Sequence, residues 1–223
     1  MLKAVIYKEW LKTRNVFLLG LLLALCMTGY DILNMNRVST MHGVEHIWQI
    51  MLMKDNVFVN HLCYLPLIAG IGIGLSQMIP EMSKKRLKLT LHLPYPQQKM
   101  ILMMLMVGFA ELLFVSLIMT GCIAIYDYSI LAPELVHRVV MTMLPWIVCG
   151  INAYFLTASI CLEGCRLQRV WLALIGVAVV SWYFMQDTPE AYNGIVIPLG
   201  IVSLLCSLLV YRSVLRFKEG LQD

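Results

Sequence analysis

The sequence predicts an all-α polytopic membrane protein with six transmembrane helices, both termini in the cytoplasm and an N-terminal amphipathic helix at the membrane surface. Three observations predict this class. The composition is 60% hydrophobic and 13% charged, with a mean hydropathy of +0.78, whereas about a quarter of the residues of a soluble domain are charged. Six apolar runs lie along the chain, and the basic residues between them fall mostly on one side. We expect one transmembrane domain over residues 1–223.

The six apolar runs are the predicted spans. They cover residues 16–33, 57–79, 100–126, 139–162, 170–185 and 195–211. A helix needs about 20 apolar residues to cross about 30 Å of hydrocarbon, and a backbone in lipid must satisfy its own hydrogen bonds. The fifth run is the shortest, so it must thin the bilayer, extend into its neighbours or stop short.

The distribution of Lys and Arg sets the predicted topology. With the N-terminus in the cytoplasm, 14 of the 17 basic residues lie on the cytoplasmic side, as the positive-inside rule requires. The residues on the cytoplasmic side are Lys3, Lys8, Lys12, Arg14, Lys84, Lys85, Arg86, Lys88, Lys99, Arg166, Arg169, Arg212, Arg216 and Lys218. The other three, Arg37, Lys54 and Arg138, lie outside. We therefore expect an integral, multi-pass protein of the cytoplasmic membrane.

The segment 1–15 precedes the first span and is predicted to be an interfacial helix. Its apolar residues recur at helical spacing, with Trp10 among them, while Lys3, Lys8, Glu9 and Lys12 lie mostly elsewhere around the helix. Such a helix lies in the membrane surface with its apolar face in the lipid.

The net charge of +4 does not indicate nucleic acid, because the positive charge is split among short segments on one side of a membrane. Anionic lipid headgroups are the expected partner of these segments. The seven cysteines lie in or near the spans. We read them as apolar packing residues, because their placement gives neither an extracellular disulfide framework nor a zinc site.

The inner loop 80–99 carries the densest group of charges. Glu81 is followed by a basic cluster, a leucine-rich stretch and two prolines, Pro94 and Pro96. The leucines alternate with period two, which fits a strand as well as a helix. We predict a short helix, because a lone strand at a membrane surface leaves its edges unpaired. A polybasic loop that only fixes topology and touches lipid is the alternative.

These features together carry a resemblance to a known family. The amphipathic start at residues 7–14, six spans, and an acidic residue, a basic cluster and a proline between the second and third spans resemble the membrane subunits of type-2 ABC transporters. In such proteins the loop between these spans forms a coupling helix that docks on a separate ATPase. Members often carry a small residue after the basic cluster, where this chain has Leu87 and Lys88.

The resemblance implies a role for individual residues. The residues expected at or near the ATPase contact are Glu81, Lys84, Lys85, Arg86 and Lys88, with Glu9 and Trp10 in the interfacial helix beside it. The chain has no GxxxxGK[ST] loop, so ATP and Mg²⁺ would be bound by the partner ATPase. The resemblance also implies a second permease copy or a paralogue, and export of the substrate. The apolar spans indicate a lipidic, amphiphilic or drug-like cargo.

Glu111 is predicted near the middle of the third span. A charge at this depth is expensive unless it is neutralised, paired or facing water. The alternatives are a functional carboxylate and a protonated glutamate bonded to a neighbouring Ser or Thr.

Gly70 and Gly74 lie four residues apart in the second span, a spacing that lets two helices approach closely. Packing within the chain is the favoured use, and a subunit interface is the alternative.

Two patterns raise the question of a metal. Met100, Met103, Met104 and Met106 could form a copper path, but methionines in a core or facing lipid are far commoner. His42 and His46 flank Glu45 in the first outer loop, where a solvated loop is the simpler interpretation. We predict no metal site.

Two other functional classes remain open on the sequence alone. An intramembrane enzyme needs convergent polar residues at membrane depth, and the apolar runs offer Glu111 without a paired His, Asp or Ser motif. An accessory or substrate-capture protein without coupling to ATP is the other alternative.

Overall fold

The structure is a computed structural model that describes residues 2–53, 57–83, 96–186 and 188–219. Within these residues it is all-α, with seven α-helices and one short 3-10 helix, η1 (Asn60–Leu62). Five helices are long and apolar enough to cross a membrane. This supports a multi-pass integral membrane protein.

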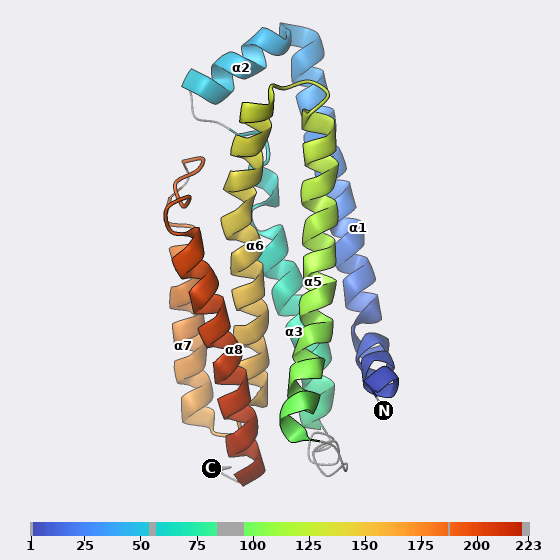
Figure 1. Cartoon of the computed structure of the whole chain (residues 1–223), viewed down its shortest axis with the longest axis vertical. Helices are drawn as coiled ribbons and strands as arrows, with labels where there is room; N and C mark the ends of the chain where they lie inside the picture. Colours follow the sequence, from blue (N-terminus) through green and yellow to red (C-terminus); the bar gives the residue numbers. More distant parts are fainter. Residues whose placement is uncertain (1, 54–56, 84–95, 187, 220–223) are drawn as a thin grey trace.

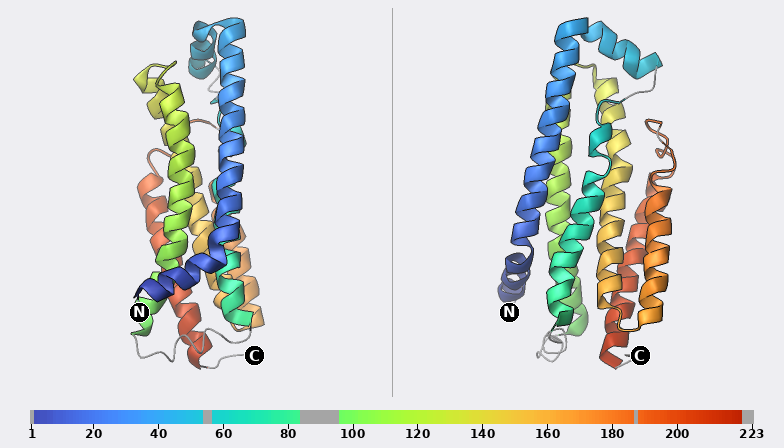
Figure 2. Two further views of the ribbon diagram at one scale, coloured as in Figure 1. Left: turned by 90° about the vertical axis from the view of Figure 1, so that its right-hand side faces the viewer. Right: turned by 180° about the vertical axis from the view of Figure 1, so that it is seen from behind.

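The first helix, α1 (Leu2–His42), is longer than the predicted interfacial helix and first span together. Its N-terminal turns run crosswise to the rest of the helix (Figure 2, left). The change of direction does not break the helix, because α1 is continuous from Leu2 to His42.

The predicted outer loop 34–56 is largely helical, which corrects the sequence-based expectation. After α1 the chain turns at Gly43, whose φ of 81° is the left-handed conformation that glycine adopts readily. The next helix, α2 (Val44–Met53), crosses the end of the bundle opposite the N-terminus (Figure 1). Ile47 and Met51 are buried against the outer ends of other helices, and this tertiary burial accounts for a helix that propensity alone does not predict.

The next three long helices pack on one another. They are α3 (Leu65–Met82), α5 (Gln97–Asp127) and α6 (Pro133–Leu162). Pro80 and Glu81, assigned above to the inner loop, lie in the last turn of α3. Residues 84–95, which contain Lys84, Lys85, Arg86 and Lys88, lie outside the described residues, so the predicted coupling helix is not described.

The last two helices, α7 (Arg166–Trp182) and α8 (Val196–Glu219), both pack on α6. α6 therefore lies at the centre of the molecule, between the α1–α3–α5 group and the α7–α8 pair (Figure 1). At 17 residues, α7 is not among the five helices that meet the length for a span. It reaches about 25 Å at 1.5 Å per residue, so a crossing by α7 stays a prediction.

α1 begins and α8 ends at the same end of the bundle (Figure 1). We call this the inner end, because the charge bias predicts that it faces the cytoplasm, and the opposite end the outer end. Large apolar side chains face away from the bundle along α1 and α8, for example Leu19 and Leu22 on α1 and Leu204 and Leu208 on α8. Lipid is the solvent that suits such a surface.

Candidate functional site at the inner end

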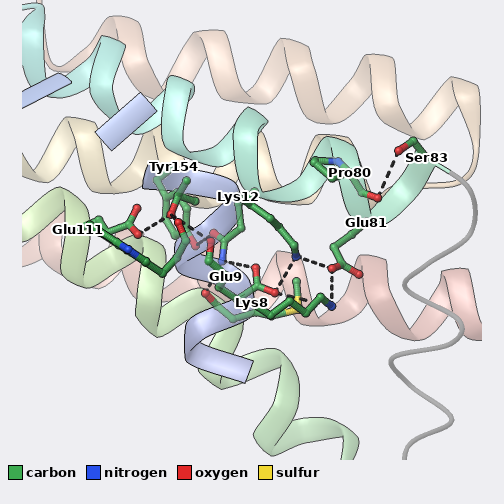
Figure 3. Close-up of polar contacts among 12 residues, drawn as sticks. Lys8, Glu9, Lys12, Pro80, Glu81, Ser83, Glu111 and Tyr154 are labelled. Atoms are coloured by element: carbon green, nitrogen blue, oxygen red, sulfur yellow. Dashed lines mark hydrogen bonds and ion pairs between the residues drawn. The ribbon is translucent and has the colours of Figure 1, made fainter. Parts of the chain in front are cut away.

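Polar and charged side chains gather where the N-terminal part of α1 meets α3, α5 and α6. We call this set the inner polar cluster. Its members are Lys8, Glu9, Lys12, Thr13, Gln77, Glu81, Glu111 and Tyr154 (Figure 3). The spacing of its four α1 members places them on one face of that helix. Glu9, Thr13, Gln77, Glu81 and Tyr154 are fully buried.

Two lysines and two glutamates form the charged half of the inner polar cluster. Lys12 Nζ lies 2.7 Å from Glu9 Oε1 and also contacts Glu81 Oε1 directly. Lys8 Nζ lies 2.7 Å from the same oxygen of Glu81. The two positive and two negative charges balance, which compensates for burying the carboxylates. The ion pairs join the N-terminal part of α1 to the last turn of α3.

A neutral hydrogen-bond chain continues from Glu9 into the bundle. Gln77 Nε2 donates to Glu9 Oε2 at 3.1 Å and to the Met104 carbonyl at 2.6 Å. The Tyr154 hydroxyl donates to Gln77 Oε1 at 2.7 Å. These hydrogen bonds therefore connect α1, α3, α5 and α6, and both oxygens of Glu9 have partners.

Gly108 on α5 makes room for the hydrogen-bonded side chains of Gln77 and Tyr154. A Cβ at that position would lie 2.5 Å from the Tyr154 hydroxyl and 2.7 Å from Gln77 Oε1. A larger residue would displace the side chains of Tyr154 and Gln77 and disturb the hydrogen bond between them.

Glu111 lies deeper, on α5. The Thr13 hydroxyl donates to its Oε1 at 2.5 Å. Its second oxygen, Oε2, is buried and has no hydrogen-bond partner among the described residues. The structure therefore brings Glu111 into the inner polar cluster through Thr13, beside the predicted interfacial helix.

Of the residues predicted at the ATPase contact, the structure places Glu9 and Glu81 together. Trp10, by contrast, is exposed, with its ring centroid 5.3 Å from that of Phe17. Lys8, Lys12, Thr13, Gln77 and Tyr154 were not predicted as members of a site. The sequence contains one sign of Gln77 and Tyr154 as site residues, which is that each places a polar group within an apolar run.

Gly70 and Gly74 lie against α6. A Cβ on Gly70 would lie 2.2 Å from the carbonyl oxygen of Gly150, and one on Gly74 would lie 3.1 Å from the side chain of Thr157. The backbones of α3 and α6 therefore approach closely within the chain. This close approach holds Gln77 and Tyr154 at hydrogen-bonding distance.

The residues considered as metal ligands lie partly in the apolar core and partly on either side of the turn at Gly43. Among the residues that the structure describes, no group of three or more His, Cys, Asp or Glu side chains could hold a metal ion. Met100 and Met104 are buried in the apolar core, and His42 is separated from His46 by the turn at Gly43. Among the described residues, no two cysteines form a disulfide.

A cavity of about 300 Å³ lies near the outer end, between the start of α3, α6 and the segment after α7. Tyr64, Trp146, Tyr183, Phe184 and Tyr192 contribute aromatic walls, and the rings of Tyr64 and Phe184 stack with centroids 4.9 Å apart. A partly aromatic cavity with a few polar groups suits a small amphiphilic molecule.

The fold and the inner polar cluster define a multi-pass helical membrane protein in which a buried ion-pair network joins its N-terminal segment to its second long helix. No family model, no curated protein and no solved structure matches the chain. The residues themselves are therefore the guide to its function.

Proposed function

We propose that the chain is the membrane-spanning permease subunit of an ATP-driven ABC transporter. A separate ATPase subunit would bind at the inner end, through the loop between the second and third spans, residues 80–99. A second copy of the chain or a paralogue would complete the pathway. The cargo would be a lipidic, amphiphilic or drug-like molecule that moves outward.

The observation that carries this proposal is the contact of Lys8 and Lys12 on α1 with Glu81 on α3. Glu81 lies in the last turn of α3, three residues before Lys84, the first residue of the basic cluster that would meet the ATPase. A push on that loop would reach Glu81 first, and the ion pairs would pass it to the N-terminal part of α1. Rigid packed elements transmit such displacements, because their packing allows discrete arrangements only.

The hydrogen-bond chain gives this displacement a route into the bundle. Glu9 bonds Gln77, and Gln77 bonds Tyr154 of α6. A change in the position of α1 against α3 would therefore alter the contacts of α6, the central helix of the molecule. The aromatic cavity near the outer end also contacts α6, and it supports an amphiphilic cargo.

Co-purification tests the proposal. The full chain, tagged at its C-terminus, is purified in mild detergent as wild type and as the triple variant Lys84→Glu, Lys85→Glu and Arg86→Glu. We expect an ATPase with a P-loop to accompany the wild type and to be lost from the triple variant. Arg14→Glu with Arg166→Glu is the control, because both arginines are exposed, near the inner end and outside the loop.

Each outcome bears on the proposal. An ATPase that stays bound to the triple variant would place the contact elsewhere and contradict the coupling role of the loop. A wild-type chain without any ATPase would favour a membrane accessory or substrate-capture role. An intramembrane enzyme would instead show turnover without ATP.

A further inference from the structure

A second polar region lies near the inner end, on the side of α6 away from α1. α7 and α8 each pack on α6 and make little contact with one another. A cavity of about 160 Å³ opens between them, beside Glu163 at the end of α6. We call it the α7–α8 groove.

Both walls of the α7–α8 groove change from polar to apolar in the same direction. On α8 the groove is lined by Leu209 and then, nearer the inner end, by Arg212 and Arg216. On α7, which runs the opposite way, Gln168 lies near the inner end and Ile175 lies deeper. Seven residues of helix span about 10 Å, so charge and apolar surface are separated along the predicted membrane normal.

The charges at the inner end of the groove are unequal. Glu163 is buried, accepts a hydrogen bond from Ser213 Oγ at 3.3 Å, and lies 3.9 Å from a guanidinium nitrogen of Arg216. Arg216 has further donors in its guanidinium, and Arg212 is exposed. Two arginines and one carboxylate line this part of the groove, which leaves a net positive charge where a headgroup would lie.

Arginine forks bind phosphate oxygens with paired hydrogen bonds. Apolar side chains deeper in the groove, Leu172, Ile175 and Leu209, provide a surface for an acyl chain. Trp171, also at the groove, is exposed near its inner end, a depth at which tryptophan is common in membrane proteins. A phospholipid has its phosphate and its chains in this same order.

We propose that the α7–α8 groove binds one anionic phospholipid, with its phosphate on Arg212 and Arg216 and one acyl chain along Leu172, Ile175 and Leu209. The bound lipid fills the space between these two helices near the inner end, and so holds α7 and α8 together on α6. This inference does not depend on the proposed transport function. It requires that α7 and α8 both lie in the membrane.

Native mass spectrometry of the full chain in detergent tests the inference. Phosphatidylglycerol and phosphatidylcholine with the same acyl chains are titrated separately. We expect the wild type to bind one phosphatidylglycerol in preference to phosphatidylcholine. The double variant Arg212→Gln and Arg216→Gln should lose about tenfold or more in apparent affinity, because it loses charge-assisted hydrogen bonds.

A matched control removes the same charge elsewhere. Lys3 and Arg14 are exposed on α1 near the inner end and do not line the groove. Lys3→Gln with Arg14→Gln should leave the affinity for the bound lipid unchanged. An equal loss of lipid affinity in both double variants would show that general surface charge causes the effect, and would contradict a binding site in the groove.

Two further measurements distinguish a lipid site from a site for phosphate alone, and loss of the site from misfolding of a variant. Soluble glycerol 1-phosphate should not displace the bound lipid. If it displaced the lipid at equal concentration, the proposed role of the acyl chain would be wrong. Ile175→Trp keeps both arginines and fills the apolar half of the groove, so it should weaken the binding of phosphatidylglycerol. This variant tests the site even if the arginine variant fails to fold. Unchanged binding by Ile175→Trp, or equal binding of the two lipids by wild type, would refute the proposal.

Discussion

Lys12 and Glu81 lie 69 positions apart in the chain, yet the ammonium group of Lys12 directly contacts the carboxylate of Glu81. Glu81 is fully buried and the Lys12 side chain is 12% exposed. The ion pair therefore fixes the crosswise part of α1 to the end of α3 at a depth where water screens it poorly. In the proposed transporter this is the point where movement of the inner loop would enter the bundle.

Lys12→Met should destabilise the fold by about 3 kcal/mol, because it leaves the two buried carboxylates, Glu9 and Glu81, with Lys8 in place of two lysines beside them. Equilibrium unfolding in detergent measures this free energy. In a Glu81→Gln background the same substitution should cost at least about 1 kcal/mol less, since contacting residues are not additive.

The exposed Lys3 on the same helix is the control. Lys3→Met should change the free energy of unfolding by no more than about 0.5 kcal/mol. Additive effects of Lys12→Met and Glu81→Gln would contradict a direct interaction between the two side chains.

Gly70→Ala should destabilise the protein by about 1–3 kcal/mol or more, because the new methyl group would lie 2.2 Å from the backbone oxygen of Gly150. Gly20→Ala is the matched control, since a Cβ there has no neighbour within 4 Å. Alanine should stabilise α1 at that position by up to about 1 kcal/mol. Equal thermal stability of the two variants would mean that α3 and α6 are not in close contact.

Thr13→Val should destabilise the protein by about 1–3 kcal/mol, because Glu111 then loses the hydroxyl that donates to its Oε1. In a Glu111→Leu background the loss should be markedly smaller. Thr120→Val is the control, because the Thr120 hydroxyl donates to the Ser116 carbonyl within the same helix. The same loss in both backgrounds would show that the bond between Thr13 and Glu111 does not contribute to stability.

Thiol labelling tests whether α7 crosses the membrane. Single cysteines at Ser83, Ser129 and Asn193 are introduced after alanine replaces the native cysteines, and intact cells are treated with a membrane-impermeant reagent. All three positions are exposed. We expect Ser129→Cys and Asn193→Cys to react and Ser83→Cys to be protected. Reaction at Ser129→Cys with protection at Asn193→Cys would mean that α7 does not cross.

Much of the fold could be predicted from apolar length alone. The runs that became α3, α5, α6 and α8 are identifiable because a membrane helix is defined by length and composition. α2 could not be predicted in this way, because its stability depends on burying Ile47 and Met51 against residues far along the chain.

The site could be predicted only in part. Glu9, Glu81 and Glu111 are acidic residues beside or within apolar runs, so the sequence alone identifies each of them as a candidate. Their connection through Thr13, Gln77 and Tyr154 depends on how α1, α3, α5 and α6 pack together. Periodicity within one helix carries no information about such contacts.

The central claim is that a separate ATPase works through the inner end of this chain. The most direct measurement is the identification of proteins that co-purify with the tagged wild-type chain from its native membrane, together with the ATP hydrolysis rate of the complex. We expect an ATPase in about equal amount, with hydrolysis in the purified sample. A chain that purifies intact with its lipids but without any ATPase would contradict the claim.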